Sequence, residues 1–252
     1  MKNIMTGKID SEFKTLVAKA FYVAGFIDNI KREWEIQHYN NGAKIFEWML
    51  RYESIHKIEE YVDSVKSYTI TSGGWNLPLL INRDAKIAFI FMKESNLNQK
   101  RNEINSAKKK SRAVQSTKPP HYAVRLSKLN KEIATQLSFD LEESKTPYEI
   151  IKTVCPNINE FDVPDDLKLM IITFKTSGDE LIKITAGFYD QNLFGIDAED
   201  WSQFINSDYS TILDTKFNKE KIQELNNKIK DIEQSMDDLT EFIEDIEVKE
   251  NK

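Results

Sequence analysis

The sequence has one cysteine and three histidines, which leaves few side chains for disulfide bonds or for metal binding. A single cysteine, Cys155, cannot form an internal disulfide, so nothing indicates an oxidising compartment, and we expect a cytoplasmic protein with Cys155 buried. The histidines His38, His56 and His121 stand far apart, without the spacing of a zinc site. We therefore expect no metal and no other cofactor.

Long apolar segments and several catalytic motifs are also missing. No segment approaches the roughly twenty apolar residues that span a bilayer, and the N-terminus lacks the apolar core of a signal peptide. We expect neither a membrane span nor secretion. The sequence contains no Gly-x-x-x-x-Gly-Lys-Ser/Thr loop and no Gly-x-Ser-x-Gly elbow, which disfavours an NTPase and an α/β-hydrolase.

Charge is strongly segregated, although the formal net charge is only -6. Residues 92–131 carry eleven basic residues against two acids, whereas residues 231–250 carry nine acids against one lysine. Segregation of this kind favours interaction surfaces of opposite sign. One hypothesis is that the acidic tail lies against the basic segment, in the same or a neighbouring subunit, until a partner competes.

The basic segment is the candidate contact for nucleic acid, because lysine and arginine displace counterions from phosphates. It is predicted as an exposed loop over about residues 93–120, rich in Asn, Gln, Ser and Lys, followed by a basic helix over 122–137. His121 or Tyr122 would stack on bases. The alternative is a solvated loop, and the pI near 5.3 counts against nucleic acid. The candidate binding residues are Lys100, Arg101, Lys108, Lys109, Lys110, Arg112, Lys118, Arg125 and Lys128.

The pattern of the first 215 residues predicts an α+β domain, with a mixed or antiparallel sheet flanked by helices. In residues 87–92 both the odd-numbered and the even-numbered positions are apolar, so both faces of this strand are expected to be buried and the strand is expected in the middle of the sheet. Strands are predicted over 67–71, 75–81, 86–92, 167–175 and 181–189, and helices over 13–24, 43–65, 122–137, 146–151 and 197–206.

The C-terminal residues 216–252 are predicted to form an acidic coiled-coil helix, because apolar residues recur at alternating steps of three and four. This pattern predicts a homo-oligomer. A helix folded back on its own domain is the alternative, and the dense acids would repel one another in a homomeric bundle. The oligomerisation residues are Ile222, Leu225, Ile229, Ile232, Met236, Leu239, Ile243 and Ile246.

A metal-dependent nuclease is the enzymatic alternative, since such enzymes need two acids to hold Mg²⁺ and a lysine to stabilise charge. The candidate residues are Asp63, Asp84, Lys86 and Glu94. Asp84 and Lys86 lie in a predicted turn, however, and Asp63 lies on a predicted helix. Convergence of these carboxylates with Lys86 around a cleft would favour the enzyme, whereas a dispersed arrangement would leave a binding function.

Several short motifs follow one another along the chain. They are Gly74-Trp75, the strand Ile87 to Phe91 with Lys93-Glu94, His121-Tyr122 before Leu129-Asn130, and Glu199-Asp200-Trp201. This order resembles an uncharacterised family of bacterial hypothetical proteins, over roughly residues 67–204. The resemblance implies no activity and no catalytic residue, only a bacterial or mobile-element origin, which would fit a phage-conflict context.

Taken together, these patterns favour a non-enzymatic, self-associating protein that binds a macromolecule, either nucleic acid or another protein, through its basic segment. The alternatives are the nuclease and a structural adaptor that recruits a partner through the coiled coil. The binding protein and the nuclease differ in whether acidic residues converge on a cleft. The adaptor is distinguished by what its tail binds.

Overall fold

The computed structural model describes residues 9–23, 48, 51–72, 75–110, 120–133, 145–177 and 180–205, with the backbone alone for 107–110. Within these ranges the α-helices are α1 (Ser11–Val23), α4 (Glu94–Lys110), α5 (Tyr122–Leu126) and α6 (Pro147–Lys152), and residues 51–56 are α-helical as well. Short 3-10 helices span Lys57–Glu60, Ser127–Asn130, Glu160–Asp162 and Ser202–Phe204. The strands are β1 (Val65–Ser72), β2 (Trp75–Asn82), β3 (Ile87–Lys93), β4 (Lys168–Ser177), β5 (Glu180–Tyr189) and β6 (Gly195–Asp200).

The strands of the described part form one six-stranded sheet in the order β1-β2-β3-β4-β5-β6. Neighbours pair antiparallel except β3 and β4, which run parallel and are joined by the crossover that contains α4, α5 and α6. The sheet therefore consists of two three-stranded meanders that meet at one parallel pair. The predicted α+β class is confirmed, and the sheet is mixed.

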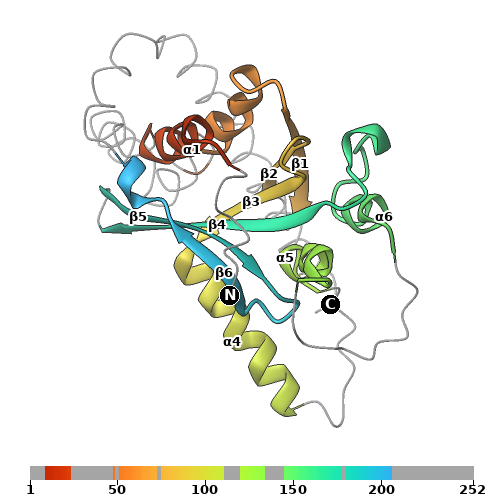
Figure 1. Ribbon diagram of the computed structural model, residues 1–252. Coiled ribbons are helices and arrows are strands. Elements are labelled where there is room, and N and C mark those ends of the chain that lie inside the picture. Colours follow the sequence, from red (N-terminus) through yellow and green to blue (C-terminus); the bar gives the residue numbers. More distant parts are fainter. Residues whose placement is uncertain are drawn as a thin grey trace, which may run out of the picture.

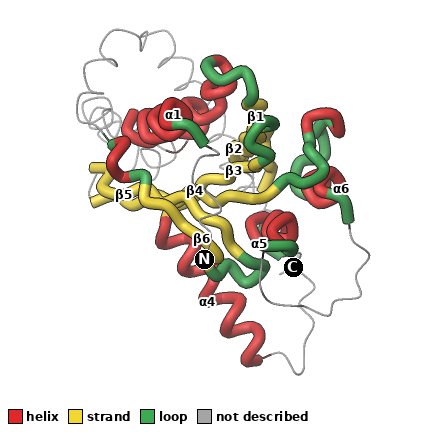
Figure 2. The backbone as a smooth tube through the Cα atoms, in the orientation of Figure 1, coloured by secondary structure: helices red, strands yellow, loops and turns green. Residues whose placement is uncertain are grey.

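Helices cover both faces of this sheet, so the molecule has three layers (Figures 1 and 2). On one face, Phe13 and Phe21 of α1 pack against Phe89 and Phe91 of β3 and Phe174 of β4. The other face carries a second core, in which α4, α5 and α6 bury Leu97, Ala123, Leu126 and Ile151 against the alternate residues of the strands.

The predicted central strand is confirmed. Residues 87–92 of β3 are all buried, because β2 and β4 flank the strand and helices lie over both of its faces. The strands predicted over 167–175 and 181–189 are also confirmed, and β4 and β5 pair antiparallel up to Ser177 and Glu180.

Two helix starts follow from their local sequence. Asp10 caps α1, where the carboxylate Oδ1 accepts a hydrogen bond from the backbone N–H of Phe13 at 2.7 Å. Thr146 and Glu149 form a capping box at the start of α6, and Pro147 occupies the first turn, where its missing N–H costs nothing. The two helices agree to within two residues with the ranges predicted from the sequence, 13–24 and 146–151.

The loop predicted over residues 93–120 is wrong for its first part, because residues 94–110 form helix α4. The segment is polar, but Leu97 is buried and Ile104, seven residues later, packs against the same core. Two apolar residues two turns apart give the helix one face that packs on the sheet. The acid in its first turn and the lysines in its last turn stabilise it further through the helix dipole.

The helix predicted over residues 197–206 is also wrong, because Gly195–Asp200 form β6 beside β5. Two acids of this segment accept hydrogen bonds from other residues. Glu199 accepts from Lys14 of α1 at 2.7 Å and from the indole N–H of Trp201 at 2.9 Å, and Asp200 accepts from the backbone N–H of Ser202. Trp201 is fully buried and ends the strand against α1.

Two predicted helices are shorter than expected. The one expected to reach residue 65 ends with the 3-10 turn Lys57–Glu60, and Val65 already belongs to β1. The one expected over residues 122–137 ends at Leu126 and continues as the 3-10 helix Ser127–Asn130. The predicted coiled coil, with all its oligomerisation residues and its boundary near residue 216, lies outside the described residues.

Candidate functional site

The sheet opens between β2 and β3 at the end of β3 that leads into α4. β2 pairs with β1 along its whole length, but with β3 only from Leu79 to Asn82. The next residue of β2 towards its start is Pro78, which has no N–H to donate to a neighbouring strand. β2 therefore separates from β3 at the proline, while residues 91–93 of β3 remain paired with β4.

A hollow of about 380 Å³ occupies this opening. We call it the aromatic hollow, because rings from several separate segments line it. The floor consists of Phe91 and Met92 from β3 together with Leu77 from β2. The aromatic lining residues are Trp48, Tyr52, Trp75, Phe91, His121 and Tyr122, and the polar ones are Ser72, Asn96, Gln99 and Lys100.

The polar side of the aromatic hollow comes from one face of α4. Asn96, Gln99 and Lys100 follow one another at helical steps of three and one, and Glu103 continues the same face one turn later. The Glu103 carboxylate accepts hydrogen bonds from Lys100 Nζ at 2.8 Å and from Gln99 Nε2 at 2.9 Å. These two bonds hold the pKa of Glu103 below its ordinary value, so the acid is ionised beside the rim.

His121 is a neutral member of the lining. Its Nδ1 accepts a hydrogen bond from the backbone N–H of Ala123 at 3.3 Å and so caps α5, which places the ring proton of the neutral form on Nε2. Burial, with a further contribution from the positive charge of Lys100, lowers the pKa of His121 to about 4. The ring also packs on Tyr122, with 4.2 Å between centroids.

The two tyrosines of the lining remain neutral as well. Burial raises the pKa of Tyr52 and of Tyr122 well above that of a free phenol. At neutral pH the aromatic hollow therefore presents uncharged rings. Lys100 carries positive charge in the lining and is paired with Glu103. Two further cations, Lys93 and Arg51, lie 5.2 and 5.8 Å from the ring centroid of Trp48. A planar, partly apolar group with an adjoining negative charge suits such a lining.

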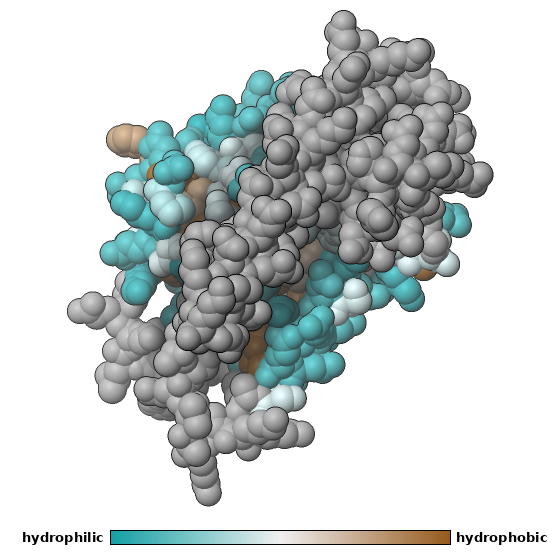
Figure 3. All heavy atoms as spheres, turned by 180° about the vertical axis from the view of Figure 1, so that it is seen from behind, coloured by the Kyte–Doolittle hydropathy of each residue, from teal (hydrophilic) through white to brown (hydrophobic). Residues whose placement is uncertain are grey.

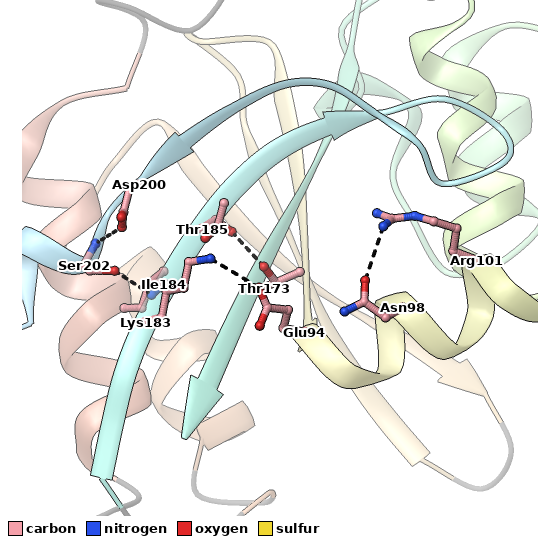
Figure 4. Close-up of polar contacts among 9 residues, drawn as sticks. All are labelled: Glu94, Asn98, Arg101, Thr173, Lys183, Ile184, Thr185, Asp200 and Ser202. Carbon is pink, nitrogen blue, oxygen red and sulfur yellow. Dashed lines mark hydrogen bonds and ion pairs between the residues drawn. The ribbon is translucent and has the colours of Figure 1, made fainter. Parts of the chain in front are cut away.

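Polar contacts fix α4 to the second meander (Figure 4). Glu94, at the start of the helix, forms an ion pair with Lys183 of β5 at 3.3 Å. Arg101 donates from Nε to the backbone carbonyl of Leu193 at 2.8 Å, and its guanidinium lies 5.8 Å from the ring centroid of Phe194. The helix is thus held at both its first and its second turn, which makes the polar side of the hollow rigid.

A second hollow of about 310 Å³ lies between α5 and α6. Val124 and Ile150 give it an apolar lining, and Arg125, Lys128 and Lys145 supply positive charge. The Arg125 guanidinium donates to the backbone carbonyl of Thr153, which ties α5 to the residue that follows α6. Two of the predicted nucleic-acid residues, Arg125 and Lys128, are therefore close together here.

The other predicted basic residues fall into three groups. Lys100 lines the aromatic hollow, while Arg101 is engaged in packing against residues 193 and 194. Lys108, Lys109 and Lys110 form the last turn of α4. Arg112 and Lys118 lie outside the described residues.

The four candidate nuclease residues do not converge. Asp84 and Lys86 lie in the turn before β3, where Lys86 has a φ of 56° and forms an ion pair with Asp166 at 3.0 Å. Glu94 follows the opposite end of β3, about 20 Å away for a seven-residue strand. Asp63 lies in the turn before β1, at the same end of the sheet as Asp84, since the carbonyl of the neighbouring Ser64 accepts from the backbone N–H of Arg83 at 2.9 Å. Only Glu94 is therefore remote from the other three. Across the described ranges, His, Cys, Asp and Glu side chains form no cluster of three suited to a metal ion.

Sequence reasoning missed Trp48, Tyr52, Trp75, Asn96 and Gln99 as site residues. Trp75 carried the clearest available signal, since a large aromatic ring directly after two glycines at a strand start is costly to expose, and it is 42 % exposed here. Asn96 and Gln99 were assigned to a loop, and only a helix brings them onto one face with Lys100. Trp48 and Tyr52 reach the hollow through tertiary packing, for which the sequence gives no local signal.

On the face seen in Figure 3 the described residues are mainly hydrophilic, with hydrophobic ones showing between them. A search of the described residues for a helix that could cross a bilayer found none.

Comparison with protein families confirms the resemblance to an uncharacterised group and extends it beyond residues 67–204. The model of DUF5986, a family of unknown function, matches residues 6–248, so the chain belongs to that family. Searches of curated proteins and of solved structures gave no match.

Proposed function

Since the family to which the chain belongs has no assigned function, we propose from the geometry of α4 that the protein is a non-enzymatic, nucleic-acid-binding protein. The observation that carries this proposal is the form of the basic segment. It is a helix of 17 residues whose C-terminal half runs away from the sheet (Figure 1) and ends in three consecutive lysines. A helix holds the backbone of these three residues within a single turn at one end of the element, which a loop would not do.

The charges along α4 support binding to phosphates. Residues 94–110 carry five basic residues and two acids. Both acids have partners within the protein, because Glu94 is paired with Lys183, and Glu103 with Lys100. At about 25 Å, a 17-residue helix is long enough to follow several phosphates of a nucleic-acid strand. Arg125 and Lys128, beside the second hollow, add positive charge on the same side of the sheet.

Binding and its salt dependence test the proposal. We expect a fluorescently labelled 20-nucleotide strand to bind the full chain with an affinity that falls steeply between 50 and 200 mM salt. The double substitution K108A/K109A should weaken binding and reduce the slope of log K against log salt by about 1.5, since two phosphate contacts are lost.

The matched control is K66A/K175A, which removes two exposed lysines from β1 and β4 and changes the net charge equally. It should leave the slope unchanged. If the intact protein shows no salt-sensitive binding, or if both double variants lower the slope equally, the proposal is wrong.

We also propose that the C-terminal residues 222–246 make the protein self-associate, on the strength of their heptad pattern. The solution mass of the full chain should be a multiple of 29.4 kDa, and a chain ending at Phe217 should be monomeric. A monomeric full chain would reject self-association. That result would leave two alternatives, a helix folded back on its own domain and the adaptor function, in which the tail binds another protein.

A further inference from the structure

The aromatic hollow has a form that the proposed function does not explain, because phosphate binding by α4 needs no recess lined by rings. Its floor is set by the sheet, where Phe91 and Met92 are fixed by the pairing of β3 with β4. Its polar side is fixed by the contacts of Glu94 and Arg101 that hold α4 on the second meander. The hollow is therefore formed before any ligand arrives, as expected of a binding site.

The rings are suited to stacking. Trp75 stands at the mouth and is 42 % exposed, whereas Tyr122, inside the hollow, is only 8 % exposed. The neutral imidazole of His121 packs on Tyr122, so the two rings form one continuous aromatic surface. A flat group that enters beside Trp75 would find aromatic surface from α5 within the same hollow.

The polar groups are arranged along α4 in the order that a nucleotide requires. The Asn96 amide offers a donor and an acceptor, and Gln99, whose Nε2 already donates to Glu103, offers its amide oxygen as a further acceptor, which matches the mixed edge of a base. Lys100 is next along the same face and supplies a cation for the phosphate. Glu103 holds Lys100 in place and competes with an incoming phosphate for it.

We propose that the aromatic hollow binds one unstacked nucleobase, with its phosphate at Lys100, so that the protein selects single-stranded over double-stranded nucleic acid. This inference rests on the proposed function, since α4 would hold the neighbouring phosphates. A base within a duplex is paired and stacked on both faces, so it cannot enter a recess between two strands of a sheet.

The test compares a labelled single strand with a blunt duplex of the same length, for the full chain and its variants. The wild type should bind the single strand at least about tenfold more tightly, which is the contribution of one stacked base. The substitution W75A should remove this preference and leave duplex affinity unchanged, and W75Y should retain most of it. Quenching of tryptophan fluorescence by uridine monophosphate, with inorganic phosphate as the control, reports the base itself.

The matched control is F161A, which removes an aromatic side chain that is 93 % exposed and absent from the lining of the hollow. It should behave as wild type. The lysine variant K108A/K109A should weaken binding to both the single strand and the duplex. The two proposals therefore fail on different results. If W75A keeps the preference for single strands, the base site alone is wrong. If the wild type binds neither the single strand nor the duplex, both proposals are wrong.

The rim charges supply a second readout. The substitution K100Q should weaken uridine monophosphate several-fold and leave uridine, which has no phosphate, unaffected. E103Q removes the carboxylate that competes for Lys100 and should tighten the monophosphate by about twofold to fivefold. Equal effects of either substitution on uridine and on its monophosphate would contradict the placement of the phosphate.

Discussion

Asn130 joins three chain segments through one buried amide. Its side chain is fully buried, its Nδ2 donates to the backbone carbonyls of Leu169 and Tyr189, and its Oδ1 accepts from the N–H of Leu169. The three distances lie between 2.8 and 2.9 Å. The amide therefore ties the 3-10 helix after α5 to the start of β4 and the end of β5.

Replacement of Asn130 by alanine should be among the most destabilising polar-to-alanine changes in the protein. It removes three hydrogen bonds and leaves a buried N–H and two carbonyls without that partner, which should cost roughly 3 kcal/mol of unfolding free energy. Urea unfolding followed by circular dichroism measures this. N102A, at an exposed site on α4, is the matched control and should change stability by less than about 0.5 kcal/mol. A similar loss in both variants would contradict the role given to Asn130.

His121 should make the folded state sensitive to acid. Because burial lowers the pKa of His121 to about 4 in the folded protein, the unfolded chain binds a proton near pH 6.5 that the folded protein does not yet bind. Protonation thus favours the unfolded state, so this contribution to stability is lost as pH falls from about 6.5 to about 4 and is constant above pH 7.

The substitution H121N tests this, since asparagine also caps helices but does not titrate. Unfolding free energies measured at pH 7 and at pH 5 should fall less in H121N than in the wild type. The other histidine of the described part, His56, is common to both proteins and cancels in the comparison. An equal fall in both proteins would show that His121 does not contribute.

At the scale of elements, α4 depends on very little apolar surface. Leu97 is the only fully buried side chain among residues 94–106, with Ile104 and Arg101 as partly buried neighbours on the same face. L97A should therefore cost about 2–4 kcal/mol of stability and should also weaken nucleic-acid binding, because the lysines would lose their rigid support. Unfolding by urea and anisotropy titration at 50 mM salt measure the two effects. Loss of stability with unchanged affinity would show that binding does not need the helix.

Elements could be predicted from the sequence where the pattern was strong, and could not where tertiary contacts decided. The apolar run of β3, the short helix α6 that begins at Pro147, and the strands β4 and β5 carry their structure locally, and all of them were predicted correctly. Residues 94–110 and 195–200 were predicted wrongly. The first segment has only two apolar residues on one face and the second has a row of acids, and either pattern is ambiguous until the residues that pack against it are known. The candidate site could not be predicted for the same reason, since it draws on segments far apart in the sequence.

At the scale of the whole molecule, one sheet connects every described strand. The pairing of β3 with β4 joins the two meanders, and α1 packs on strands of both of them. We therefore expect the α+β part to unfold in a single transition, with tryptophan fluorescence and far-ultraviolet circular dichroism giving the same midpoint in urea. Two separated midpoints would indicate that the meanders form independent units.

The parallel pair β3–β4 also governs how the chain folds while it is being made. β3 ends at residue 93 and β4 begins at residue 168, so 75 further residues must be synthesised before β4, the second strand that pairs with β3, begins to emerge. At 5–20 residues per second, ribosomal synthesis of that crossover takes about 4–15 s. During this interval the most apolar of the described strands has an unpaired edge, so the nascent chain is most exposed to aggregation, and to chaperone capture, at mid-length.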